Sequence, residues 1–139
     1  MNYKEFMQSL IDDKVSGIYL FDSKEEYLNT TIIDLAKEKV SFPDFNLVEL
    51  KGNVEVENMK NAYETYPVME DMKYIIWKDI DLSKNSLKLY ESLLENLTMD
   101  IKNFPNYATL LIFSDASPFK GKFFKEVKKY GQIVDITRL

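Results

Sequence analysis

The stretch Ala108-Thr109-Leu110-Leu111-Ile112-Phe113 is a continuous apolar run, and it decides the fold class. A strand that is buried on both faces has this character, whereas a strand with one wet face alternates apolar and polar residues. The run Lys73-Tyr74-Ile75-Ile76-Trp77, which extends to Lys78, has the same composition. Both stretches therefore indicate interior strands of a parallel sheet.

Three shorter apolar runs, at residues 17–21, 45–50 and 132–136, predict further strands. Helical patterns separate them. We expect an opening helix that turns Tyr3, Phe6, Leu10 and Ile11 to one face, and a helix from Ser23 to Lys39 that a Ser23–Glu26 capping box begins. Three more are expected: a helix that Asn53 caps and that ends near Thr65, one that Ser83 caps and that carries Leu87, Tyr90, Leu94 and Leu97, and a short one through Phe123, Phe124 and Val127 that ends at Gly131.

Strands that alternate with helices predict an α/β fold, a three-layer sandwich around a five-stranded, mostly parallel sheet. The 139 residues suffice for one domain with a single core. The chain stops soon after its last predicted strand, so we expect residues 1–139 to be one domain of a longer polypeptide.

Composition excludes several function classes. There is no Cys and no His, so thiolate chemistry and the commonest general base and zinc ligand are missing. Arg138 is the only arginine, and the net charge of −5 argues against a dedicated nucleic-acid binder. No apolar run could span a bilayer and the N-terminus does not resemble a signal peptide, so the sequence predicts a cytoplasmic protein.

The loop after the first predicted strand is where such a fold would hold a nucleotide. It reads Phe21-Asp22-Ser23-Lys24-Glu25-Glu26, with no glycine to let backbone N–H groups surround a phosphate and with three carboxylates that repel one. Asp79 and Asp81 could hold a cation, and Ser114-Asp115 ends a strand, but turn and capping roles are the favoured interpretation. We expect no catalytic residue, cofactor or metal.

The segment from Lys120 to Lys129 is locally basic and interleaved with phenylalanines. It could touch nucleic acid or an acidic partner. The favoured interpretation is an amphipathic helix that buries its aromatic rings and leaves its lysines in water.

The run Tyr66-Pro67-Val68-Met69 is apolar where a polar connecting loop is expected. Val68 and Met69 need a partner, which is either the core of this protein or another protein. The residues alone leave both alternatives open.

The ordered set of motifs resembles the N-terminal domain of the DNA polymerase III delta subunit. The motifs are Tyr3-Lys4-Glu5-Phe6, Ile18-Tyr19-Leu20-Phe21 with Glu26-Tyr27-Leu28, Tyr66-Pro67-Val68-Met69, Lys73 to Asp79, and Leu110-Leu111-Ile112-Phe113. They cover nearly the whole chain. The resemblance implies an AAA+/RecA-like P-loop fold that lacks a working P-loop, in agreement with the loop after the first strand.

The resemblance also implies a role in DNA replication. A clamp-loader subunit of this kind binds the sliding clamp (beta subunit) and helps to open it, together with gamma/tau and delta prime, and meets DNA through the full complex. The family's clamp-binding pair of large apolar residues matches Val68 and Met69, which are smaller, and Tyr66, Pro67 and Met72 are expected to assist. The alternatives are a non-catalytic scaffold domain and a carboxylate-based phosphotransfer or receiver-like domain that uses Asp79 or Asp22 with a lysine.

Overall fold

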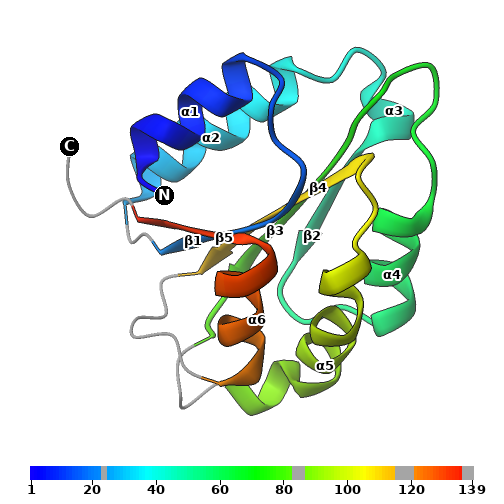
Figure 1. Ribbon diagram of the computed structural model, residues 1–139. Helices are drawn as coiled ribbons and strands as arrows, with labels where there is room; N and C mark the ends of the chain where they lie inside the picture. The colour runs from blue at the N-terminus through cyan, green and yellow to red at the C-terminus, as the bar shows by residue number, and fades with distance from the viewer. Residues whose placement is uncertain (23–24, 83–86, 115–120, 136–139) are drawn as a thin grey trace.

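The computed structural model describes residues 1–22, 25–82, 87–114 and 121–135. Five strands form one sheet in the order β2–β3–β4–β1–β5, and every neighbouring pair is parallel (Figure 1). The predicted parallel sheet is confirmed. In chain order the strands are β1 (Gly17–Asp22), β2 (Leu47–Lys51), β3 (Lys73–Ile80), β4 (Ala108–Ser114) and β5 (Gln132–Asp135).

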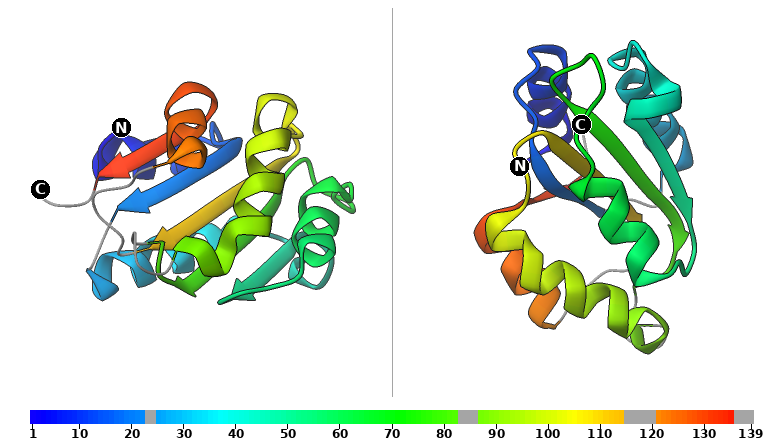
Figure 2. Two further views of the ribbon diagram at one scale, coloured as in Figure 1. Left: turned by 90° about the horizontal axis from the view of Figure 1, so that it is seen from below. Right: turned by 90° about the vertical axis from the view of Figure 1, so that its right-hand side faces the viewer.

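Helices cover both faces of the sheet, which confirms the three-layer sandwich. On one face lie α1 (Tyr3–Ile11) and α2 (Glu26–Glu38), and on the other lie α4 (Val56–Glu64), α5 (Glu91–Asp100) and α6 (Lys122–Tyr130) (Figures 1 and 2). A single-turn helix, α3 (Pro43–Asn46), precedes β2, and two 3₁₀ turns, η1 (Leu87–Tyr90) and η2 (Ile101–Asn103), flank α5.

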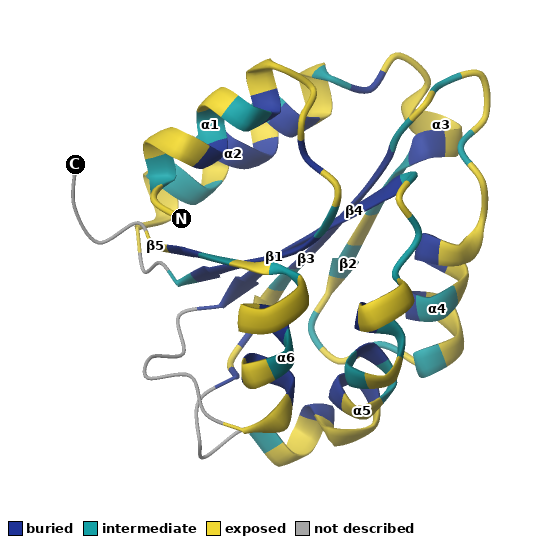
Figure 3. Cartoon of the chain, viewed as in Figure 1, coloured by how far each residue is buried: buried dark blue, intermediate teal, exposed yellow. Residues whose placement is uncertain are grey.

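The core has two halves because successive side chains of a strand point to opposite faces. In β3, Tyr74 and Ile76 pack toward α1 and α2, whereas Ile75 and Trp77 pack toward α4, α5 and α6. Trp77 is fully buried, and its Nε1–H donates to the Gly52 carbonyl at 2.8 Å. In Figure 3 the buried colour accordingly follows the inner faces of the helices and the strands between them.

Several predicted boundaries were wrong. Phe45 and Asn46 belong to α3 and not to a strand, because Pro43 takes the first helical position, where its fixed φ favours a helical turn. Asn53 does not cap α4. The chain first packs Val54 against the core, and the helix then begins at Val56 with Glu55 at the N-cap.

Smaller differences concern the element ends. Ile11, predicted to face the core from α1, is 53% exposed, whereas Phe6 and Leu10 are buried as predicted. The helix α2 begins after Glu25 rather than at a Ser23 cap; Ser23, Ser83 and Ile136 lie outside the described residues. None of the helices in the described ranges combines the length and the apolar character that crossing a bilayer requires.

Candidate functional site

The loop that joins α4 to β3, residues 65–72, exposes most of its apolar side chains. Tyr66 is 74% exposed, Val68 41% and Met69 78%. The loop leads into the first residue of β3, so it lies at the amino end of the parallel sheet (Figure 3). It is therefore remote from the carboxyl ends of the strands, where α/β sheets usually bind small ligands. Val68 and Met69 face outward.

Asn46, at the end of α3, fixes the middle of this loop. Its side chain is fully buried, its Oδ1 accepts from the Val68 N–H at 2.6 Å, and its Nδ2 donates to the Val68 carbonyl at 2.8 Å. The side-chain amide of Asn46 thus pairs both the backbone N–H and the backbone carbonyl of Val68. A buried amide is stable only when its hydrogen bonds are made, so the bonds hold the loop in one arrangement.

Glu70 ties the loop to α3 a second time. Its carboxylate accepts from the Ser41 N–H at 2.7 Å, from the Phe42 N–H at 2.9 Å and from Asn46 Nδ2 at 2.6 Å. Burial would raise the pKa of the Glu70 carboxyl, but these three donors together hold it below its ordinary value. Glu70 is therefore an ionised acceptor at neutral pH, and its hydrogen bonds are charge-assisted.

Tyr66 and Met72 close the two ends of the loop in different ways. The Tyr66 ring packs on the ring of Tyr107, with centroids 4.6 Å apart, and Tyr107 donates its hydroxyl hydrogen to the Glu64 carbonyl at 2.6 Å. Met72 instead packs against the core and accepts from the Thr109 hydroxyl at 3.1 Å. The predicted group is thus divided: Tyr66, Val68 and Met69 are exposed, Pro67 is intermediate, and Met72 anchors the loop.

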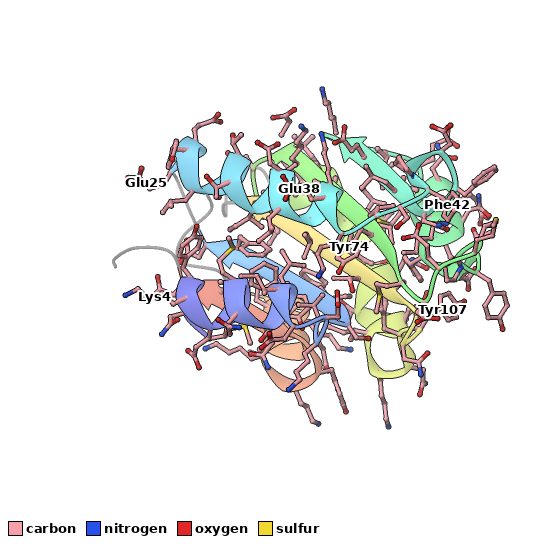
Figure 4. All side chains as sticks on the ribbon, turned by 90° about the horizontal axis from the view of Figure 1, so that it is seen from above. Lys4, Glu25, Glu38, Phe42, Tyr74 and Tyr107 are labelled. Atoms are coloured by element: carbon pink, nitrogen blue, oxygen red, sulfur yellow. The ribbon has the colours of Figure 1, made fainter. Side chains whose placement is uncertain are left out.

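Two aromatic residues beside the loop were missed by the sequence interpretation. Phe42, just before α3, is 38% exposed, and Phe45, within α3, is 60% exposed. Figure 4 labels Phe42 and Tyr107 at the same end of the molecule. The signal that could have found them is Pro43, because a helical turn begun there makes the following aromatic residues part of a loop and not of a buried strand.

A polar cavity of about 530 Å³ lies at the opposite end, beyond β3 and β4. It is lined by Glu26, Asn29 and Thr30 of α2 and by Lys78, Asp79 and Asp81, among others. Asp79 was predicted to be a turn residue, but it lies inside β3, with a φ of +57° at a register shift of the strand. Within the described ranges no group of three or more Asp, Glu, His or Cys side chains could hold a metal ion.

The basic segment forms α6, as the favoured interpretation expected. Phe123, Phe124 and Val127 are buried, and Lys122, Lys125, Lys128 and Lys129 are exposed; Lys120 lies outside the described residues. A groove of about 750 Å³ runs between α5 and α6, lined by Leu94, Met99 and Phe123 among others.

Comparison with known proteins gives the family and the fold. The family model for the DNA polymerase III delta subunit matches residues 20–137. The structure is similar to the Bacillus subtilis DNA clamp loader delta protein, with a TM-score of 0.75 and 17% identity, over 98% of this chain and 42% of that one. It is also similar to a DNA polymerase III gamma-subunit-related protein from Thermotoga maritima (TM-score 0.64, 11% identity), over 96% of this chain and 46% of that one.

The chain therefore spans less than half the length of either solved structure. No curated protein matches its sequence. At these identities the two structures establish the fold alone, an AAA+-like α/β domain with a five-stranded parallel sheet.

Proposed function

The chain belongs to the DNA polymerase III delta subunit family, and we propose that this domain binds the sliding clamp through the α4–β3 loop and helps to open it. The observation that carries the proposal is the outward orientation of Val68 and Met69 on a loop that hydrogen bonds hold in place. The two residues match the family's apolar clamp-binding pair. In the alternative that was open from the sequence, they would have turned into the core.

The two side chains can supply part of the binding energy. Full burial of a Val or Met side chain contributes about 1.5–3 kcal/mol, so the exposed shares of Val68 and Met69 together offer about 2–3.5 kcal/mol. A micromolar complex requires about 8 kcal/mol. Other contacts must therefore contribute, and the Tyr66 ring is the nearest large exposed group on the same loop. Pro67 restricts the loop, which lowers the entropy lost on binding.

Opening of the clamp would follow from differential affinity. A domain that binds the opened ring more tightly than the closed ring shifts the equilibrium toward the opened form, and no chemistry on this chain is required. We further propose that ATP acts through other subunits of the loader (gamma/tau and delta prime), that the domain is non-catalytic and cytoplasmic, and that it meets DNA through the full complex.

The direct test is the affinity of the chain for the sliding clamp from the same source organism, measured by calorimetry. Val68→Ala/Met69→Ala should weaken binding about 10- to 100-fold, which corresponds to most of the energy assigned to the pair. The matched control is Leu89→Ala/Met99→Ala, two residues that are 67% and 76% exposed on and beside α5. Unchanged affinity in a folded Val68/Met69 variant would reject the proposal.

A further inference from the structure

The α4–β3 loop and α3 are held together as one unit. Two side chains make the hydrogen bonds between them: Asn46 reaches from α3 to both polar groups of Val68, and Glu70 reaches from the loop to the N–H groups of Ser41 and Phe42. The two side chains also bond to each other at 2.6 Å. If the loop moved relative to α3, these hydrogen bonds would break.

This arrangement determines what the loop presents. With both polar groups of Val68 paired inward, its side chain stays at the surface, and Met69 follows with a φ of +63°. A non-glycine residue adopts that left-handed conformation only when its surroundings impose it. The bonds that Asn46 and Glu70 make on either side of Met69 provide that constraint.

The same hydrogen-bonded unit carries a second exposed apolar side chain, on α3. Phe45 is 60% exposed and directly precedes Asn46 in α3, so its backbone belongs to the same hydrogen-bonded unit as the loop. An aromatic side chain is the kind of residue that carries much of the energy of protein interfaces. Val68 and Met69 alone fall short of a micromolar complex, so a further contact is needed.

We infer that Asn46 and Glu70 are positioning residues for the clamp contact, and that Phe45 contacts the same clamp as Val68 and Met69. This inference rests on the proposed function. Asn46 and Glu70 act by holding the loop in its bound conformation before the clamp arrives, which reduces the entropy lost on binding. Phe45 acts by direct burial.

The first measurement needs no clamp. Hydrogen exchange of the Val68 amide should accelerate in Asn46→Ala, because the acceptor of that N–H is removed, while amides of β1 and β4 keep their wild-type protection. If Asn46→Ala does not fold, Glu70→Gln provides a milder change, since it keeps the side-chain shape and removes the negative charge. A Val68 amide that is equally protected in the variant would overturn the positioning role.

The second measurement is clamp affinity in a double-mutant cycle. Asn46→Ala and Phe45→Ala should each weaken binding about tenfold in the wild-type background. In the Val68→Ala/Met69→Ala background the Asn46 effect should become clearly smaller, because Asn46 positions those two side chains, whereas the Phe45 effect should persist. The control is Tyr27→Ala on α2, a ring that is 79% exposed.

The outcomes separate this inference from the proposed function. If the wild-type chain binds the clamp and Val68→Ala/Met69→Ala weakens binding, but Phe45→Ala and Asn46→Ala bind normally, the inference is wrong and the proposed function stands. An Asn46 effect of the same size in both backgrounds would show general destabilisation and would also overturn the inference. If the wild-type chain does not bind the clamp, both are rejected.

Discussion

Gly131→Ala is expected to destabilise the protein at the junction of α6 and β5. A Cβ at Gly131 would lie 2.5 Å from the Ile18 carbonyl oxygen and 3.4 Å from the Val127 carbonyl oxygen. Ordinary van der Waals contacts begin at 3.4 Å, so the turn at Gly131 must move about 0.9 Å away from the Ile18 carbonyl oxygen. Ile18 cannot yield, because β1 pairs with β4 on one side and with β5 on the other. The displacement therefore falls on the edge strand β5.

The expected cost is that of inserting one carbon into a close-packed site, about 1–3 kcal/mol. Gly131 has a φ of −118°, which any residue adopts, so backbone strain does not contribute. The assay is urea unfolding together with amide exchange of β5. Gly52→Ala is the control: its φ is +64° and the nearest atom is 3.8 Å away, so it should cost about 1 kcal/mol through strain and leave β5 protected. If Gly131→Ala unfolds at the same urea concentration as the wild type and the amides of β5 exchange at wild-type rates, the close approach of this turn to β1 is refuted.

The remaining predictions concern pH and nucleotide. Burial raises the pKa of Tyr74 to about 12, with smaller contributions from Asp13 and other neighbouring charges. The unfolded chain releases that proton near pH 10, so the free energy of unfolding should fall as the pH rises from 10 to 12, and Tyr74→Phe should reduce the fall. Urea titrations across this range check the slope, and an equal slope in the variant would contradict the assignment. Calorimetry with Mg²⁺ and ATP should show no binding, because the sequence from Asp22 to Glu26 has no glycine and three carboxylates; stoichiometric heat would contradict a disabled phosphate loop.

Much of the fold could be predicted from the sequence because buried parallel strands leave a strong pattern. The run Ala108 to Phe113 became β4, with every residue buried, and Lys73 began β3 as expected. The buried faces of helices could also be predicted: Phe123, Phe124 and Val127 fall at helical spacing, and all three are buried.

The errors arose where local signals compete. Phe45 and Asn46 directly precede the apolar residues of β2 and were assigned to that strand, but Pro43 begins a helical turn that includes them, and that turn leaves Phe45 exposed. The bonds from Asn46 to Val68 join residues 22 positions apart, and no periodicity encodes such a contact. The loop could therefore be singled out from its composition, whereas its outward orientation and its support from α3 required the three-dimensional structure.

The two ends of the sheet offer different surfaces. The carboxyl end has a polar cavity lined by residues such as Asp79 and Asn29, and the Oδ1 atom of Asn29 is buried there without a hydrogen-bond partner among the described residues. The amino end has the exposed apolar group of Val68, Met69 and Phe45. Apolar side chains held on a hydrogen-bonded loop are suited to contact with another protein, which is why the proposed clamp contact lies at the amino end.

The most direct test of the clamp contact is methionine oxidation with and without the sliding clamp. Met69 and Met99 are 78% and 76% exposed, so the chain carries its own internal control on α5. Dilute peroxide should oxidise both at comparable rates in the free chain, as mass spectrometry of the peptides would show. With saturating clamp, oxidation of Met69 should slow while that of Met99 stays unchanged. Protection of Met99 with Met69 still reactive would contradict the proposed contact.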